Sequence, residues 1–406
     1  MIVMPFFFGG PPLLWRRFFL LIALSGIAPY TVVGAFSLDS ARIFQSSSYA
    51  ENLVGTEHHR YQALLESIQT FFDMTDDDRS DCQRIFHGRG NNFPGLEHLT
   101  LDWYPPVFLF SSFRDSDKSR REVQLVLYTL ECERKRRIRQ SSTSMKNGVS
   151  DIEMVPPINL VYQNRDGIVL TELIAGSVPD HPHIVEEIGN KYIVNLLKSK
   201  NHGLFLDMRN GRKWVQDHAE GKLVLNLFSY TCAFSVAALS GGADEVINMD
   251  MAKGPLKQGQ RNHEINFDFG STANNTTNEK QEGSARFLAH NIFKSWGKLK
   301  RLGPYDIIIA DPPSYQKGSF VVKKDYGKII RRIPSLLKPG GHALLCLNAP
   351  ELDTTWLRDL VQIEAPGLDF VQRIDNPDSF PVLDEEKALK VMLFQLPTDY
   401  VVTAEE

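Results

Sequence analysis

Two acidic residues stand at the ends of apolar segments that have the composition of buried strands. Asp250 closes the segment Glu245–Asp250, and Asp311 directly follows the very apolar segment Tyr305–Ala310. Because ligands of parallel α/β sheets bind beyond the carboxyl ends of the strands, both carboxylates are expected at one site. A carboxylate in the position of Asp250 can accept hydrogen bonds from both hydroxyls of a ribose. The sequence therefore predicts a ligand that contains a nucleoside.

The loop that follows the first strand lacks the glycines that would bind a phosphate. The strand Leu223–Phe228 runs into the loop Ser229–Cys232 and then into an alanine-rich helix that ends at Gly241. Without a Gly-x-Gly-x-x-Gly spacing, a pyrophosphate would find few backbone donors here. A nucleoside without phosphates fits better, and S-adenosylmethionine (SAM) has that description. The same absence counts against a nicotinamide-dependent oxidoreductase, which a similar sheet would also allow.

The segment Asp-Pro-Pro-Ser-Tyr suits recognition of a planar base. Pro312 and Pro313 fix two φ angles and remove two backbone donors, which leaves Asp311 and nearby carbonyls as a rigid set of acceptors. These acceptors can hold an amino group, Tyr315 can stack on the base, and Asp311 is the candidate for proton removal. Cys346 is a candidate nucleophile, because cytosine C5 methylation requires a thiolate; a buried, inert core cysteine is the competing interpretation.

These residues require a sheet of strands that alternate with helices. After Asp250, strands are expected at Ala285–Asn291, Tyr305–Ala310, His342–Leu347 and Leu389–Gln395, and helices at Lys253–Asn266, Ile292–Leu302, Asp325–Leu337 and Thr354–Ile363. This rhythm predicts an α/β fold with a doubly wound, Rossmann-like sheet. All the candidate residues then lie at one edge of that sheet.

A smaller, β-rich region is expected before this sheet. It contains a predicted helix at His58–Met74, strands at Glu122–Leu130, Ile158–Tyr162 and Val169–Leu173, and paired strands at Lys191–Leu197 and Gly203–Met208. The basic run Glu133–Arg139 is interpreted as a solvated hairpin face or linker, with phosphate binding as the alternative. Residues 82–113, rich in glycine, proline and aromatic residues, are interpreted as a loop-and-strand packing module, with substrate contact by His87 and Arg89 as the alternative.

The composition bounds the class of protein. The 406 residues, 42% of them hydrophobic, suffice for two or three cores, and the net charge of −4 argues against a general nucleic-acid coat protein. A local basic groove remains compatible with that charge. The four cysteines are widely spaced, so neither a metal site nor a disulfide framework is predicted.

The N-terminus has the pattern of a secretory-type signal. Trp15-Arg16-Arg17 precedes the apolar run Phe18–Val33, and small residues follow at a cleavage position. An uncleaved membrane anchor and a misassigned start are the alternatives. Phe36-Ser37-Leu38 resembles the second half of bipartite presequences in algae with secondary plastids. An organelle, with the plastid favoured, is therefore the expected location, and the secretory pathway or a membrane anchorage is the alternative.

The motifs together resemble a known family. LNLFSYTCAFSVAALSGGA, the strand-end Asp250, DPPSY and LLKPGG are similar to class I SAM-dependent methyltransferases grouped with the large-subunit ribosomal-RNA methyltransferases, and FHGRGNNFPGLEHLTLDWYPP and HGLFLDMRNGR resemble a bacterial branch of that group. The resemblance covers residues 80–396. Together with the signal pattern, it predicts a presequence at 1–35, an accessory region at 36–198 and a methyltransferase domain at 199–399.

The resemblance also implies a function and a set of site residues. The function is methylation of a base in ribosomal RNA, with Asp311–Tyr315 receiving the target base and Lys323, Lys324, Lys328, Arg331 and Arg332 holding phosphates. Cofactor contacts are assigned to Phe205, Asp207, Arg209, Asn226, Phe228, Tyr230, Thr231, Ala233, Asp250, Met251, Asn291 and Ile292.

Three departures from the family pattern keep alternatives open. Many relatives carry glycine in place of Cys232 and aspartate in place of Asn291, although an amide oxygen can still accept from an adenine amino group. The ribosomal cytosine enzymes show a cysteine pair where only Cys346 stands here, which weighs against cytosine C5 chemistry. The alternatives are a SAM-dependent methyltransferase for a protein amine or small molecule, and a non-catalytic scaffold. No oligomeric state is predicted.

Overall fold

The computed structural model describes residues 47–114, 116–144, 155–198, 201–267, 283–316 and 318–401. The chain divides into the compact units Met1–Tyr49 and Ala50–Glu406, and apart from the first residues of α2 every element below belongs to the second unit. The predicted presequence lies outside the described residues. Within the described ranges, no helix combines the length and apolar character needed to cross a membrane.

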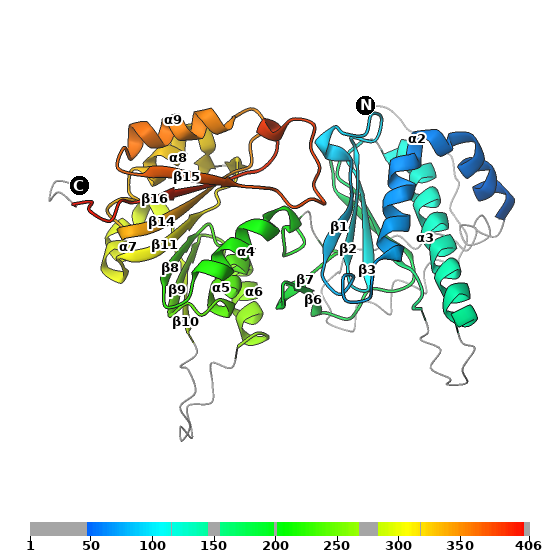
Figure 1. Cartoon of the computed structure of the whole chain (residues 1–406), viewed down its shortest axis with the longest axis horizontal. Helices are drawn as coiled ribbons and strands as arrows, with labels where there is room; N and C mark the ends of the chain where they lie inside the picture. The colour runs from blue at the N-terminus through cyan, green and yellow to red at the C-terminus, as the bar shows by residue number, and fades with distance from the viewer. Residues whose placement is uncertain are drawn as a thin grey trace, which may run out of the picture. The chain divides into compact units, whose positions relative to one another are not determined.

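A seven-stranded sheet forms the C-terminal part of the structure (Figure 1). In spatial order its strands are β10 (Ser284–Ala289), β9 (Glu245–Asp250), β8 (Leu223–Leu227), β11 (Tyr305–Ala310), β14 (Leu337–Leu347), β16 (Lys390–Gln395) and β15 (Asp369–Ile374). The first five run parallel, and β16 is antiparallel to both of its neighbours. The strand order reverses between β8 and β11, which is the point where such sheets bind ligands.

Helices cover both faces of this sheet (Figure 1). One face carries α4 (Arg209–His218) and α5 (Ala233–Ser240), with α6 (Lys253–Glu264) beside α5, and the other carries α7 (Trp296–Leu302), α8 (Val322–Ile330) and α9 (Thr354–Glu364). Successive strand residues point to opposite cores: Val224 and Ile309 face α4 and α5, whereas Leu225 and Ile308 face α7 to α9. The predicted Rossmann-like α/β fold is confirmed.

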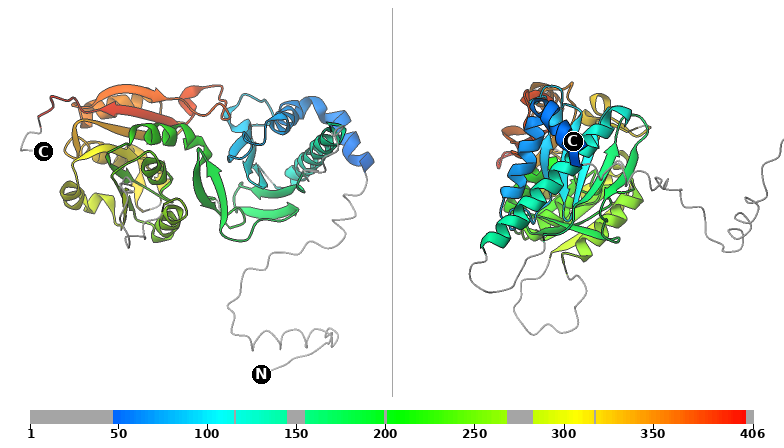
Figure 2. Two further views of the ribbon diagram at one scale, coloured as in Figure 1. Left: turned by 60° about the horizontal axis from the view of Figure 1, so that its bottom comes forward. Right: turned by 90° about the vertical axis from the view of Figure 1, so that its right-hand side faces the viewer.

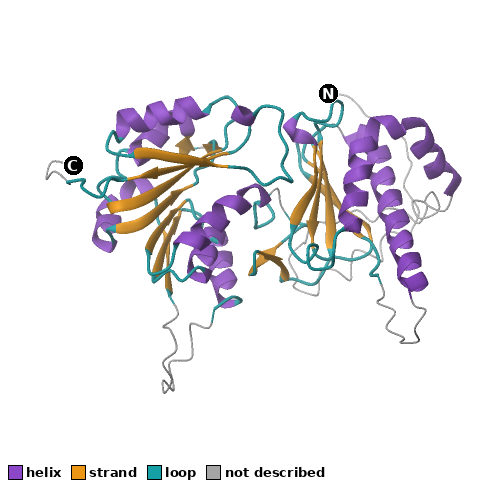
Figure 3. Cartoon of the chain, in the orientation of Figure 1, coloured by secondary structure: helices purple, strands orange, loops and turns teal. Residues whose placement is uncertain are grey.

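A second sheet, of five strands, lies in the N-terminal part. Its strands are β1 (Gln83–His87), β2 (Leu99–Tyr104), β3 (Val107–Ser112), β4 (Asn159–Asn164) and β5 (Leu170–Ala175), in that order. The long helices α2 (Ser47–Asp73) and α3 (Ser116–Ser144) pack on one face (Figures 2 and 3). On the other face Leu109 and Val161 share a hydrophobic cluster with Val236 of α5 and with Leu204, which precedes the seven-stranded sheet in the chain.

The connection between the two sheets is a hairpin. It consists of β6 (His183–Glu187) and β7 (Asn190–Val194), whose Val185 and Tyr192 join the same shared cluster. Lys191–Leu197 was predicted to pair with Gly203–Met208, and this is wrong: β7 pairs with β6, and residues 203–208 form a loop that ends in the short helix η2 (Leu206–Met208).

Three other predicted elements are also corrected. The segment Glu122–Leu130 is helical within α3, because its apolar residues Val123, Val126 and Leu130 recur at helical spacing and are buried. The basic run Glu133–Arg139 belongs to the same helix, so it is neither a hairpin nor a linker. Helix α8 ends at Ile330, whereas the predicted helix extended to Leu337, and the Lys-Pro-Gly-Gly sequence that follows Leu337 lies inside β14.

Candidate functional site

A cavity of about 600 Å³ lies at the carboxyl ends of β8, β9, β11 and β14. Its walls contain most of the residues assigned from the sequence: Phe205, Asp207, Asn226, Phe228, Tyr230, Thr231, Ala233, Asp250, Met251, Ile292, Asp311, Pro312, Pro313 and Tyr315. Arg209, Asn291 and Cys346 are not among its lining residues. The edge of the sheet that the strand-end pattern indicates therefore carries a cavity of the size that small ligands occupy.

The loop after β8 has an unusual backbone. Phe228, Tyr230 and Cys232 have φ angles of 56°, 47° and 61°, in the left-handed region that residues other than glycine rarely adopt. Asp250 supports this loop, because its Oδ2 accepts a hydrogen bond from the Tyr230 amide at 3.0 Å. Thr231 Oγ1 adds a bond to the Gly203 carbonyl at 2.6 Å. Strain of this kind is found at ligand sites that the surrounding structure holds in place.

Asp250 retains capacity for a ligand. Besides the Tyr230 amide, its carboxylate accepts only one other hydrogen bond that the described residues donate, from the Ala252 amide to Oδ1 at 2.7 Å. A carboxylate offers about four acceptor positions, so each oxygen can still accept one hydroxyl hydrogen. The side chain is half-buried and lines the cavity. This is the geometry that binding of a ribose requires.

A buried chain of polar side chains orients Asn226 at the cavity wall. His263 Nδ1 lies 2.7 Å from the Gly259 carbonyl, which can only accept, so this nitrogen carries the proton. Burial lowers the pKa of His263 to about 4, so Nε2 is unprotonated at neutral pH and accepts from Ser235 Oγ at 2.8 Å. Ser235 Oγ in turn accepts from Asn248 Nδ2 at 2.9 Å.

The last link of this chain sets the direction of the Asn226 amide. Asn248 Oδ1 accepts from Asn226 Nδ2 at 3.0 Å, which commits the Asn226 nitrogen to the protein interior. The Asn226 oxygen is left as the polar group available to the cavity. Asn226 therefore presents an acceptor, which suits an ammonium or another hydrogen-bond donor.

Asp311 follows β11 and is half-buried in the cavity wall. Burial raises its pKa to about 7, the negative charge of Asp207 adds to this increase, and the positive charge of Arg212 opposes it. Burial likewise raises the pKa of Asp207. A carboxyl with a pKa near neutrality is suited to proton transfer at physiological pH.

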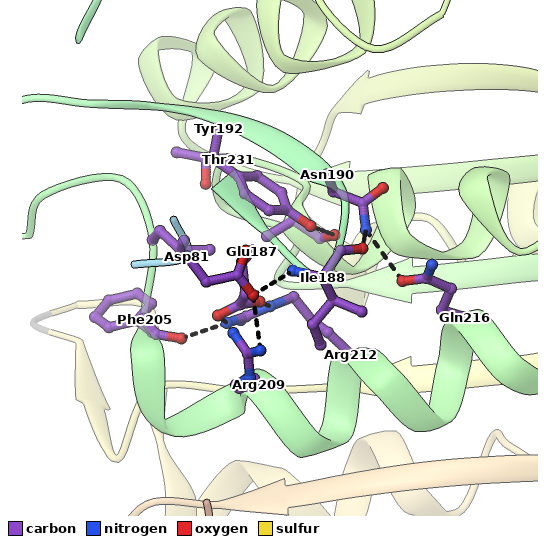
Figure 4. A network of polar contacts seen from close by, with 12 residues as sticks. Asp81, Glu187, Ile188, Asn190, Tyr192, Phe205, Arg209, Arg212, Gln216 and Thr231 are labelled. Atoms are coloured by element: carbon purple, nitrogen blue, oxygen red, sulfur yellow. Dashed lines mark hydrogen bonds and ion pairs between the residues drawn. The ribbon is translucent and has the colours of Figure 1, made fainter. Parts of the chain in front are cut away.

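Arg212 belongs to a polar network at the base of the cavity (Figure 4). Its guanidinium donates to both oxygens of Glu187, at 2.7 and 2.8 Å, and to the Phe205 carbonyl at 2.8 Å. Nearby, Arg209 pairs with Asp81 at 2.8 Å. Through Asp81, Arg209 thus helps to connect α4 with β6 and β1. Arg209 does not line the cavity.

The residues present fit SAM as a ligand. Two buried polar atoms, Ser229 Oγ and Asn291 Oδ1, have no hydrogen-bond partner within the described part of the chain, and Ser229 and Ile292 line the cavity. The lining includes three aspartates, whereas its arginine, Arg212, is already paired with Glu187. Carboxylates in excess favour a cationic ligand and disfavour a dinucleotide phosphate. SAM, with its sulfonium and ammonium groups, satisfies this requirement.

The two cysteines singled out from the sequence are buried. Cys346 lies in β14 at 0% exposure, and burial, with the negative charges of Asp311 and Asp207, raises the pKa of its thiol well above the ordinary value. A thiolate is thus disfavoured there. Cys232 packs against Gly259, where an added Cβ would come within 2.5 Å of its sulfur. That close approach of α6 gives the residue a packing role.

Sequence reasoning missed several lining residues. Ser229, Phe234, Pro255, Phe293, Phe320 and Asn348 all line the cavity. Asn348 follows the end of β14, so the strand-end pattern that identified Asp250 and Asp311 could have found it. Phe320 lies on β13 (Phe320–Val321), which pairs with β12 (Tyr315–Gln316). No local sequence pattern predicts this short hairpin.

Fold and site together define a class I methyltransferase: a Rossmann-like sheet with a ribose-type carboxylate after one strand and an Asp-Pro-Pro loop after another. The sequence pattern of the S-adenosylmethionine-dependent methyltransferase family matches residues 83–395. The chain therefore belongs to this family. The resemblance read from the motifs is confirmed at this level, and so is SAM as the cofactor of the family.

Individual relatives agree with this assignment. "Ribosomal RNA large subunit methyltransferase I" of Aeromonas salmonicida is 33% identical over 175 residues, which is 42% of this chain and 41% of the relative. The protein of the same name from Vibrio vulnificus is 28% identical over 247 residues, 57% of this chain and 59% of its own. The chain thus spans less than two thirds of the length of these curated relatives.

Solved structures show the same fold. A methyltransferase structure determined in complex with SAH (S-adenosylhomocysteine) has a TM-score of 0.61 and 25% identity, and covers 82% of this chain and 81% of that one. A SAM-dependent methyltransferase from Streptococcus mutans has a TM-score of 0.62 at 24% identity and covers 82% of this chain and 80% of its own.

Proposed function

We propose that this chain transfers a methyl group from SAM to a base in ribosomal RNA. The observation that carries the proposal is the cavity that both Asp250 and Asp311 line, at the carboxyl ends of β9 and β11 on either side of β8. The names of the curated relatives, which are large-subunit ribosomal-RNA methyltransferases, support RNA as the substrate.

The residues of the cavity divide into those that would hold SAM and those that would meet the target. Asp250 would accept the ribose hydroxyls, and the Asn226 oxygen would accept from the ammonium. Asn291, which precedes the lining residue Ile292, would accept from the adenine amino group through its unpartnered oxygen. When bound, SAM supplies an electrophilic methyl group on a positively charged sulfur. The remaining contribution of the protein is alignment in a site screened from water, together with removal of one proton.

Asp311 is the group that would remove this proton. As a carboxylate it can accept a hydrogen from the attacking nitrogen or another nucleophile of the base, and it becomes neutral when it does so. Pro312 and Pro313 offer no amide hydrogen to compete for it. Tyr315, whose side chain is 68% exposed at the rim, is placed to stack on a base that enters. Cys346 has no part in this mechanism, although its assignment as a nucleophile stays a prediction.

Transfer of label tests the substrate. Methyl-tritiated SAM is incubated with the full chain and with either an unmodified transcript of large-subunit ribosomal RNA, total protein, or a small-molecule extract. Label in RNA with wild-type protein, and its loss with Asp311→Asn, is the expected result. Label in protein or small molecules alone would contradict the RNA proposal and favour the alternative substrates, and the absence of transfer in all three would favour a scaffold.

We also propose an organelle, with the plastid favoured, as the place where the chain works. The support is the sequence pattern of residues 15–38, which lie outside the described residues. A fluorescent protein fused after residue 60 should accumulate in plastids of an alga with secondary plastids. Retention in the secretory pathway would contradict this location.

A further inference from the structure

Two arginines at one edge of the five-stranded sheet form no direct ion pair within the described ranges of the chain. Arg89 follows β1 in the short helix η1 (Gly88–Gly90), and Arg165 directly follows β4. β1, β3 and β4 run in the same direction, so their carboxyl ends meet at this edge. Phe113, which comes directly after β3, lies between them in the sheet order and contacts both guanidinium groups.

The aromatic ring brings the two charges together. The Phe113 ring centroid lies 3.9 Å from the guanidinium carbon of Arg89 and 5.1 Å from that of Arg165. Burial lowers the pKa of Arg89, and the positive charges of Arg165 and Arg84 lower it further. Burial also lowers the pKa of Arg165; the negative charge of Asp102 opposes this decrease and the positive charge of Arg84 adds to it. Holding like charges this close has an electrostatic cost that an anion between them would remove.

The neighbouring acidic group, Asp102, is paired directly with another arginine. Asp102 is engaged by Arg84, with distances of 2.6 and 3.1 Å between the guanidinium nitrogens and the two carboxylate oxygens. Across the described ranges, no carboxylate lies within ion-pair distance of Arg89 or Arg165, and Arg165 Nε is buried without a hydrogen-bond partner. His87 is neutral, because burial lowers its pKa to about 3. The guanidinium groups of Arg89 and Arg165 can therefore donate hydrogen bonds to a ligand.

The position of this pair relative to the cavity suggests its ligand. The charges of Arg84 and Asp102 both act on the pKa of Asp207, which lines the cavity. Arg84 and Asp102 therefore lie close to the cavity wall. Burial lowers the pKa of His202, which lies between the lining residues Asn201 and Gly203, and the charge of Arg165 also lowers it. An RNA strand whose base enters the cavity has phosphates on both sides of that base, and this edge offers cations to one of them.

We propose that Arg89 and Arg165 together bind a backbone phosphate of the RNA strand that delivers the target base. Guanidinium groups match phosphate oxygens with paired hydrogen bonds, and two of them spaced by an aromatic ring can share one phosphate. The proposal rests on the proposed function, since it names the part of the accessory sheet that holds the same substrate. The basic residues near the Asp-Pro-Pro loop differ, because Lys328 and Arg331 are already paired with Asp325 and Glu364.

Binding and methylation of unmodified large-subunit ribosomal RNA test the proposal with the full chain. The double variant Arg89→Ala/Arg165→Ala should weaken RNA binding about tenfold or more, while binding of SAM stays unchanged. The slope of log K against log salt should become shallower by about 1 or more, because at least one phosphate contact is lost. The matched control Lys213→Ala/Arg286→Ala removes two exposed, ion-paired cations and should leave the slope unchanged.

Two different failures can be told apart. If wild-type protein methylates the RNA and the double variant binds it with unchanged affinity and salt slope, the phosphate site is refuted and the proposed function stands. An equal effect of the control variant would also refute it, because general charge would then explain the loss. If wild-type protein binds SAM but neither binds nor methylates the RNA, the proposed function is refuted. The phosphate site, which rests on that function, is then refuted as well.

Discussion

At the scale of residues, the pKa of Asp311 predicts how the rate depends on pH. The ionised carboxylate is the form that accepts a proton, and burial raises its pKa to about 7. We expect kcat/KM to rise about tenfold per pH unit below this pKa and to level off above it. Asp311→Asn should lower the plateau about 100-fold or more and remove the pH-dependent step.

The charge on Asp207 provides a check on this assignment. Because Asp207 raises the pKa of Asp311, Asp207→Asn should shift the midpoint of the pH profile to lower pH while the profile keeps its shape. A wild-type profile that stays flat from pH 5 to pH 8, measured under conditions where methyl transfer limits the rate, would contradict the role of Asp311 as the base.

The buried polar chain behind Asn226 predicts that a serine remote from the ligand affects SAM binding. Ser235→Ala leaves Asn248 Nδ2 and His263 Nε2 without their partner, which should cost about 1–3 kcal/mol of folding stability. It also frees the amide of Asn226 to reorient, so the Kd for SAM should rise several-fold. Ser240→Ala, an exposed change on the same helix, should alter neither quantity. Equal SAM affinity in the two variants would show that the chain does not orient Asn226.

The two carboxylates of the cavity could be predicted from the sequence, whereas the polar chain behind Asn226 could not. Asp250 and Asp311 follow apolar strands directly, so their position could be inferred from sequence. Ser235, Asn248 and His263 lie on different elements, and each of them alone looks like an ordinary core or helix residue. Their hydrogen bonds exist only after α5, β9 and α6 have packed together.

At the scale of elements, Tyr326 on α8 predicts a link between stability and rate. Its hydroxyl is buried between the carboxyl ends of β11 and β14, 3.2 Å from the Ala310 carbonyl and 2.9 Å from the Cys346 carbonyl. Ala310 immediately precedes Asp311. Tyr326→Phe should therefore lower the free energy of unfolding by about 1 kcal/mol and also reduce kcat.

Tyr305→Phe is the matched control for this substitution. Its hydroxyl, also buried, donates to the Leu299 carbonyl at 3.0 Å, at the opposite end of β11. Denaturant unfolding should show similar losses in both variants, whereas kcat should fall only in Tyr326→Phe. A reduced kcat in both variants would assign the effect to general destabilisation of the sheet.

The errors in predicted elements also have physical reasons. A strand was predicted at Glu122–Leu130 because the apolar residues alternate over a few positions, but a period near 3.6 describes the buried set over the whole of α3. The Lys-Pro-Gly-Gly sequence normally ends helices, yet here Gly340, at φ 81°, bends the backbone within β14. Local signals identify a turn without saying which element contains it.

At the scale of the whole molecule, the buried ion pair between Arg212 and Glu187 predicts how strongly α4 depends on the hairpin β6–β7. Both side chains are almost fully buried, so Glu187→Ala leaves Arg212 charged and unpaired and should lower the free energy of unfolding by about 3–5 kcal/mol. Asp217→Ala removes the exposed partner of Lys213 and should cost less than about 1 kcal/mol. Chemical denaturation followed by circular dichroism measures both, and similar losses would contradict the account.

This junction could not be predicted from sequence. Glu187 and Arg212 read as ordinary charged residues in two separate regions, and only the shared packing of the hairpin with α5 makes them a buried pair. The α/β class and the binding edge, by contrast, follow from the repeating strand and helix pattern. The division of the chain into the regions 36–198 and 199–399 stays a prediction.

The most direct test of the central claim is calorimetric titration of the full chain with SAM and with SAH. We predict saturable binding of both ligands, and a loss of affinity of about tenfold to a hundredfold in Asp250→Ala, because this variant loses charge-assisted hydrogen bonds to the ribose. The thermal unfolding of the variant should be recorded alongside to show that it is folded. Absence of binding to either ligand, or unchanged binding in a folded Asp250→Ala, would contradict the account of this cavity.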